Sequence, residues 1–95
     1  MRAGEAVELK LEVRNFQTRA QTHRIEIHTP PGLTAEPRVL EGGLAAEARG
    51  KFSFRITAAR DAKPGVRLIA FDITRDGMHQ GELFDAILEI TPAKP

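Results

Sequence analysis

Residues 7–14, Val7-Glu-Leu-Lys-Leu-Glu-Val-Arg14, alternate strictly between apolar and charged side chains. Successive side chains of a β-strand point to opposite faces, so this period of two predicts a strand with one face in a core and one in water. The charged positions also alternate in sign, which favours pairing with charges on a neighbouring strand. The segment therefore indicates a half-buried strand of an antiparallel sheet.

Further strand patterns follow along the chain, separated by proline- and glycine-rich turns. They cover residues 23–28, 51–57, 66–74 and 82–91. Strands with one apolar face must pair across a common core. We therefore expect an all-β protein, an antiparallel β-sandwich of about six to seven strands, with a small β-barrel as the alternative. The side chains expected in the core include Leu33, Val39, Phe52, Phe54 and Phe84.

Length and composition narrow the classes of function. The chain has 95 residues, a net charge of +1 and no cysteine. Acidic and basic residues are interspersed, so we expect no nucleic-acid partner. No apolar run approaches the roughly 20 residues that span a bilayer, so we expect no membrane insertion. We expect residues 1–95 to form one domain that belongs to a longer protein.

The order of strand ends and turns resembles a known family. The resemblance lies in Gly4-Glu-Ala-Val7, Arg14-Asn15, Thr29-Pro-Pro-Gly-Leu33, Thr34-Ala-Glu-Pro37, Ala62-Lys-Pro-Gly65 and a terminal hairpin. This pattern is similar to the Ig-like domains of the NPCBM-associated type, which are appended to bacterial glycosidases and other large enzymes. The resemblance implies an Ig-like sandwich, an accessory role, no catalytic motif and no cofactor. It also implies an exported or periplasmic location.

The stretch Asp72-Ile-Thr-Arg-Asp-Gly-Met-His-Gln-Gly-Glu-Leu83 matches part of a calcium-binding EF-hand loop. Asp72, Asp76 and Gly77 occupy three of its fixed positions. However, the twelfth position is Leu83, where a bidentate glutamate is needed, and the flanking segments have strand patterns. Because Asp-Gly between apolar-rich strands is typical of a tight turn, the stretch predicts a β-hairpin and no metal site.

We expect no enzyme, because no pairing of a nucleophile with a base is visible. His23 and His28 are an odd number of residues apart and should face opposite sides of a strand. We expect all three histidines, His79 included, to be solvated. Sugar binding is also disfavoured because the chain has no tryptophan or tyrosine. Phe16, in the loop after the first strand, is the candidate for an exposed aromatic side chain.

The last two strands carry the clearest signal for a partner. Leu83 and Ile87 fall on the nominal outer face of the last strand, and the preceding strand is apolar on both faces, with Ile69 and Phe71 among its side chains. An exposed apolar patch on a small domain often marks a docking surface. We therefore predict a docking patch of Leu83, Ile87, Ile69 and Phe71.

The sequence favours a noncatalytic accessory or interaction module that docks on another domain of the same protein or on a protein subunit. The first alternative is an independent module that binds a carbohydrate or, less favoured, calcium. A homodimer formed by exposed edge strands is a further alternative.

Overall fold

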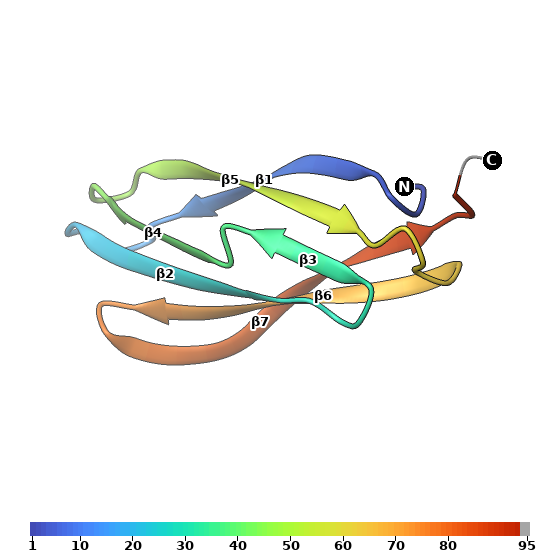
Figure 1. Cartoon of the computed structure of the whole chain (residues 1–95). Coiled ribbons are helices and arrows are strands. Elements are labelled where there is room, and N and C mark those ends of the chain that lie inside the picture. The colour runs from blue at the N-terminus through green and yellow to red at the C-terminus, as the bar shows by residue number, and fades with distance from the viewer. Residues whose placement is uncertain (94–95) are drawn as a thin grey trace.

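The computed structural model describes residues 1–93, apart from the side chains at positions 83 and 84. These residues form no helix, and their strands are arranged in two antiparallel sheets (Figure 1). The seven strands are β1 (Ala6–Arg14), β2 (Gln21–His28), β3 (Leu33–Glu36), β4 (Val39–Leu44), β5 (Arg49–Ala58), β6 (Gly65–Arg75) and β7 (Met78–Ile90). The predicted sandwich and its strand number are confirmed.

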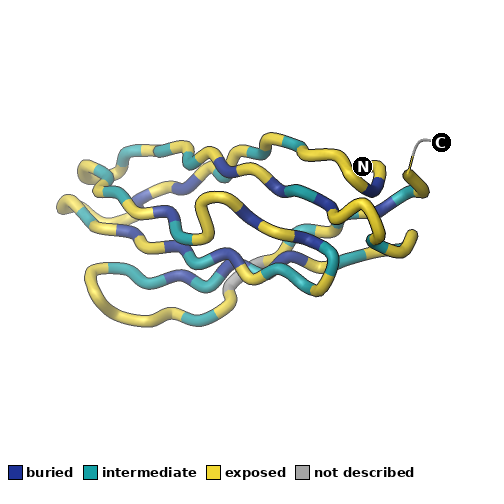
Figure 2. Tube along the Cα trace, in the orientation of Figure 1, coloured by how far each residue is buried: buried dark blue, intermediate teal, exposed yellow. Residues whose placement is uncertain are grey.

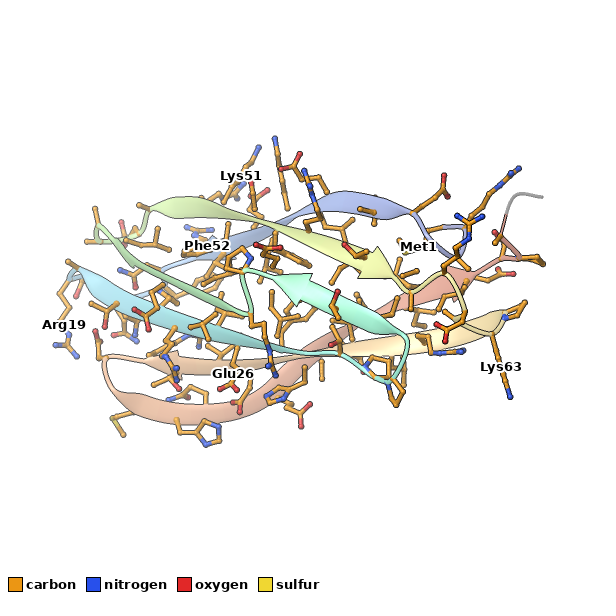
Figure 3. The ribbon with its side chains drawn as sticks, in the orientation of Figure 1. Met1, Arg19, Glu26, Lys51, Phe52 and Lys63 are labelled. Atoms are coloured by element: carbon orange, nitrogen blue, oxygen red, sulfur yellow. The ribbon has the colours of Figure 1, made fainter. Side chains whose placement is uncertain are left out.

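One sheet has the strand order β1-β5-β3, and the other has the order β4-β2-β6-β7. The molecule is elongated, with extents of 52 × 20 × 17 Å. Both ends of the described chain lie at one end of the sandwich, here called the terminal end (Figure 1). The β1–β2, β4–β5 and β6–β7 connections lie at the opposite end, here called the loop end. Figure 3 shows Met1 and Lys63 at the terminal end and Arg19 at the loop end.

The alternating segment that opens the chain forms β1 and pairs with β5. Its charged face meets complementary charges, because Glu8 lies opposite Arg55 and Glu12 lies opposite Lys51. Its apolar face is half-buried or buried and points toward the second sheet. The predicted division between a core face and a water face is confirmed for this strand.

The core lies between the sheets and is mainly aliphatic (Figure 2). Isoleucines supply most of its fully buried side chains: Ile25, Ile27, Ile56, Ile69, Ile73 and Ile90. Phe54 of β5 meets Phe71 of β6 edge to face, with ring centroids 5.8 Å apart. This contact joins the two sheets. Each such aromatic pair contributes about 0.5–1.5 kcal/mol beyond the burial of its area.

The predicted connection after the second strand contains two short strands. β3 joins the sheet of β1, and β4 returns to the sheet of β2. Leu33 is buried as expected, but Val39 is only half-buried and its neighbour Leu40 is buried instead. Because neighbours on a strand face opposite sides, the one-residue error exchanges the two faces of β4. The segment after β4 is a turn, and β5 begins at Arg49.

The stretch that partly matches a calcium loop forms the β6–β7 hairpin. Asp76 and Gly77 are its two loop residues, with φ of 48° and 76°. Positive φ at both loop residues is typical of a type I′ turn, which asparagine, aspartate and glycine favour. The hairpin prediction is therefore confirmed.

Candidate functional site

The predicted docking patch is partly wrong. Ile69 and Phe71 are buried in the core, because β6 turns this set of alternate residues toward β1 and β5. Ile87 is exposed on the outer face, as predicted. The side chain of Leu83 lies outside the described residues. On the outer face of the β6–β7 pair, β6 therefore presents its even-numbered residues, such as Leu68. The prediction had named the odd-numbered Ile69 and Phe71.

Three apolar side chains form a cluster on this outer face. Leu68 of β6 lies directly opposite Ile87 of β7, and Val66 is on the same face of β6. Their exposed fractions are 56% for Leu68, 69% for Ile87 and 62% for Val66. We call these three residues the outer cluster. The sequence contained one signal for this cluster. If Leu68 and Ile87 both face outward, they form an apolar pair on the surface.

The outer cluster lies close to the two ends of the described chain. The N-terminal amino group of Met1 donates a hydrogen bond to the carbonyl of Glu89 over 2.9 Å. The backbone N–H of Ala3 donates to the carbonyl of Thr91 over 3.0 Å, and Arg2 forms a parallel bridge with Thr91. Glu89 itself lies opposite Val66. The cluster is thus beside the point where the chain begins and the last strand ends.

At the loop end, Phe16 is 74% exposed, which confirms the prediction of an exposed loop aromatic. The neighbouring Asn15 explains the exposure of Phe16, because Asn15 is fully buried and fixes the loop. Its side-chain amide donates to the carbonyls of Arg19, Leu44 and Ala45, and its oxygen accepts from the N–H of Gln17. With Asn15 turned inward, Phe16 is held outward. The Arg14 guanidinium lies 5.0 Å from the centre of its ring.

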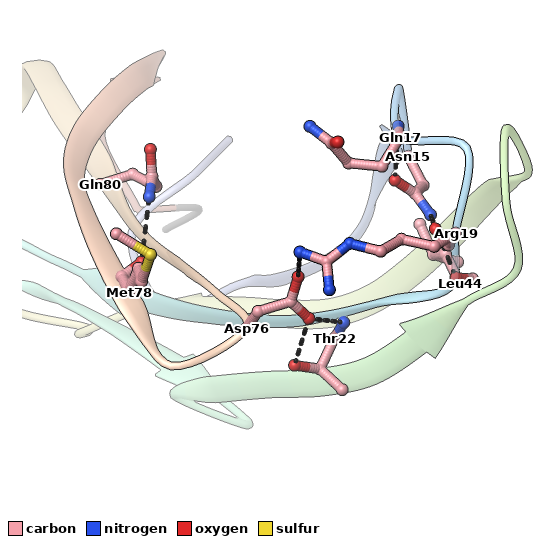
Figure 4. A network of polar contacts seen from close by, with 8 residues as sticks. All are labelled: Asn15, Gln17, Arg19, Thr22, Leu44, Asp76, Met78 and Gln80. Carbon is pink, nitrogen blue, oxygen red and sulfur yellow. Dashed lines mark hydrogen bonds and ion pairs between the residues drawn. The ribbon is translucent and has the colours of Figure 1, made fainter.

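A cleft of about 260 Å³ separates the β1–β2 loop from the β6–β7 hairpin. Figure 4 shows the Gln17 and Arg19 side chains extending from the loop toward the hairpin, with Met78 and Gln80 on the hairpin side. Met78 is 70% exposed. We call this the loop-end cleft, and its lining residues are Arg14, Phe16, Gln17, Arg19, Gln21, Arg75, Asp76, Met78 and Gln80.

Asp76 ties the hairpin to β2. Its carboxylate accepts hydrogen bonds from the Thr22 N–H over 2.9 Å and from the Thr22 hydroxyl over 3.3 Å, while its own N–H donates to the Thr22 carbonyl. Arg19 lies 3.7 Å from the same carboxylate. The hydrogen bond from the Thr22 N–H is the main reason that the pKa of Asp76 lies below its usual value.

His23 and His28 lie on opposite faces of β2, as their spacing predicted. His23 faces the core and His28 faces outward. The expectation that all three are solvated is wrong for His23, which is on the same face as Ile25 and Ile27 and is 2% exposed. Burial is the main reason that its pKa lies below the ordinary 6.5, and the charge of Arg75 lowers it further.

On the outer face, His28 and His79 both approach Asp72. The His79 Nε2 lies 2.5 Å from one carboxylate oxygen, and the His28 Nε2 lies 3.7 Å from the other. Within residues 1–93, as far as they are described, no group of three or more metal-binding side chains has the geometry to hold a metal ion. The same part of the chain contains no helix that is long and apolar enough to cross a membrane.

A surface depression of about 470 Å³ lies over β4, β2 and β6. Its floor includes Gly43, where a side chain would meet nothing within 4 Å, beside Arg24 and Glu41. These two charges already pair, with 3.0 Å between the Arg24 Nε and a Glu41 carboxylate oxygen. The charges that line the depression therefore neutralise each other, and the rest of its lining is uncharged residues such as Thr22, Thr74 and the glycines.

Comparison with family models finds no match, and comparison with curated proteins finds none either. Among solved structures, the chain is similar to SSP-19, an MSP-domain protein like family member in Caenorhabditis elegans. The identity is 8%, the match covers 98% of this chain and 92% of that one, and the TM-score is 0.50. At this identity the likeness concerns the fold alone. Together with the two antiparallel sheets, it identifies the fold as an Ig-like β-sandwich.

Proposed function

We propose that this domain is a noncatalytic accessory module that docks, through the outer cluster, on another domain of the same polypeptide or on a protein subunit. The observation that carries the proposal is the contiguous exposure of Val66, Leu68 and Ile87 on one sheet face. Single exposed apolar residues are ordinary, but three in contact range on adjacent strands suit an interface.

The size of the outer cluster favours a tethered partner. Covering the exposed half of each side chain is worth about 1 kcal/mol, or roughly 3 kcal/mol for the three. This is too little to hold two free proteins together, because association costs at least about 4 kcal/mol. A partner on the same polypeptide is already at an effective concentration in the millimolar range.

The surroundings of the outer cluster resemble the rim of an interface. Asp85 and Glu89 are exposed on the same face of β7, on either side of Ile87. Interfaces commonly place a small apolar centre inside a polar, solvent-accessible rim. The two carboxylates favour a partner surface with basic side chains around an apolar pocket.

Photocrosslinking in the full natural polypeptide tests the proposal. A photoreactive phenylalanine derivative at position 68 should give one dominant crosslink, mapped by mass spectrometry to a neighbouring domain or a subunit. The matched control is the same group at Lys51, which is exposed on the other sheet. Ile87→Asp should weaken the crosslink from position 68. Equal crosslinking from both positions, or no effect of Ile87→Asp, contradicts the proposal.

An independent ligand-binding module is the second candidate, because the exposed Phe16 ring offers a surface on which a sugar ring could stack. A glycan array and a calcium titration of the isolated chain test this alternative. A saturable signal that Phe16→Ala abolishes supports it for a glycan. A negative result in both assays removes it.

A further inference from the structure

The loop-end cleft combines three features that together suit a binding site. It is lined by three arginines, it has an exposed apolar side chain on each side, and both of its walls are fixed by hydrogen bonds. We propose that this cleft binds an extended acidic segment of another protein, with an apolar side chain of that segment held between Phe16 and Met78. This site is at the opposite end of the sandwich from the outer cluster (Figure 1).

The first wall of the cleft is fixed by Asn15. Besides the side-chain hydrogen bonds described above, the Asn15 N–H donates to the carbonyl of Ala48 over 2.9 Å, and the Glu47 N–H donates to the carbonyl of Gln17 over 3.1 Å. The β1–β2 loop is therefore attached at several points to the β4–β5 turn. A loop held in this way loses little conformational entropy when a ligand binds.

The second wall is the β6–β7 hairpin, and Asp76 attaches it to the first. The Asp76 carboxylate bonds to Thr22 at the start of β2 and also approaches Arg19 from the loop (Figure 4). Met78 begins β7 immediately after the turn. The spacing between Phe16 and Met78 is thus set by structure that is already formed without a ligand.

Charge determines which segment the cleft would bind. Arg14, Arg19 and Arg75 line the cleft with a single carboxylate, that of Asp76, so its lining has a net charge of +2. The Asp76 carboxylate is held by hydrogen bonds from Thr22 and lies 3.7 Å from Arg19, whose positive charge offsets its own. Arginine binds carboxylates well, because its planar guanidinium can donate two parallel hydrogen bonds. The cleft therefore suits a segment rich in aspartate or glutamate.

The apolar and amide side chains favour a polypeptide over other anions. Phe16 and Met78 can enclose one apolar side chain, and aromatic residues and methionine are enriched at the centres of protein interfaces. Gln17, Gln21 and Gln80 add amides that can both donate to and accept from a peptide backbone. A nucleic acid would require a more extended basic surface than this net charge provides.

Nuclear magnetic resonance titration of the isotopically labelled chain tests the inference. The probe is a capped heptapeptide that alternates glutamate with leucine. Saturable shifts are expected for amides in residues 15–21 and 75–80, with a dissociation constant at or below about 1 mM in low salt. Affinity should fall as salt is added. Phe16→Ser and Arg19→Gln should each weaken binding at least about fivefold, and Lys63→Gln, at the terminal end (Figure 3), should leave it unchanged.

Two comparison peptides decide whether acidic and apolar groups are both needed. A heptapeptide that alternates lysine with leucine and one that alternates glutamate with serine should each bind at least about tenfold more weakly than the probe. Vesicles with one fifth phosphatidylserine and a single-stranded oligonucleotide should cause no saturable shifts in these residues. Binding only to the vesicles or the oligonucleotide overturns the proposal, as does probe binding that the Phe16→Ser and Arg19→Gln variants retain. Because none of these variants alters Leu68 or Ile87, the result does not depend on the docking of the outer cluster.

Discussion

His23 of β2 lies directly opposite Arg75 of β6, and both project toward the space between the sheets. Neither ring nitrogen of His23 has a hydrogen-bond partner of good geometry among the described residues, although the Gln21 backbone lies close enough to favour the protonated ring, and the Arg75 Nε has no partner either. Burying an unpaired polar group is costly, and burying a second positive charge beside a guanidinium would cost more. The folded protein therefore keeps His23 neutral.

This arrangement makes stability depend on pH. The pKa of His23 is lower in the folded state than the ordinary 6.5, because of burial and then of Arg75. Well above pH 6.5 His23 is neutral in both states, so it adds no pH dependence there. As the pH falls below this value, the unfolded chain binds the proton first and the free energy of unfolding decreases. Urea denaturation between about pH 7.5 and pH 5 should show this decrease.

His23→Leu supplies the matched comparison. Because it replaces an unpaired buried ring with an apolar side chain, it should leave stability at pH 7.5 equal or higher and should flatten the pH profile in this range. If the His23→Leu profile is parallel to that of the natural chain, the folded protein does not exclude the proton from His23.

Asn15 is expected to be the most sensitive polar residue. Asn15→Ala removes the amide that donates hydrogen bonds to three carbonyls and the oxygen that accepts one from the Gln17 N–H. These backbone groups are then left unpaired. The free energy of unfolding should fall by roughly 2–4 kcal/mol, measured by urea denaturation. Gln17→Ala is the control and should change it by less than about 0.5 kcal/mol. A small effect of Asn15→Ala would mean that the loop keeps its shape without this side chain.

Asp76 should contribute stability that disappears in acid. Hydrogen bonding from Thr22 lowers its pKa in the folded state, so its contribution is complete above the unfolded value of about 4 and is lost as the pH falls through the lower folded value. Asp76→Asn retains an oxygen acceptor and suits the positive φ of the turn, but it cannot titrate. Below about pH 4, the natural chain should therefore lose more stability than Asp76→Asn does, by urea denaturation. Equal losses would contradict this role.

The sequence predicted the strands well where only one face is apolar, and poorly where both faces are. In β1, each apolar residue has charged neighbours, so the buried face is unambiguous. In residues 66–74, apolar side chains occur on both faces, and the sequence does not say which face meets the second sheet. The pairing with β2 decides it, because Ile73 lies opposite Ile25 and Phe71 lies opposite Ile27. The docking patch was misplaced for this reason.

The candidate sites also depend on contacts between segments far apart in the sequence. The exposure of Phe16 could be anticipated from its position in a loop, but the loop-end cleft could not. Its second wall is a hairpin about 60 residues later in the chain, joined to the first through Thr22 and Asp76. His23 could have been recognised as buried, because it continues the alternate positions of Ile25 and Ile27.

Adjacent substitutions in β6 test the corrected assignment of its faces. Ile69 is 0% exposed, whereas its neighbour Leu68 is largely exposed. Ile69→Ala should therefore lower the free energy of unfolding by about 2–5 kcal/mol, since it leaves a cavity between the sheets. Leu68→Ala should change it by less than about 0.5 kcal/mol. Urea denaturation of both variants distinguishes the two possible orientations of the strand. If Leu68→Ala proves the more destabilising, then β6 presents its other face to the core, and the outer cluster would consist of the residues that the sequence pattern first suggested.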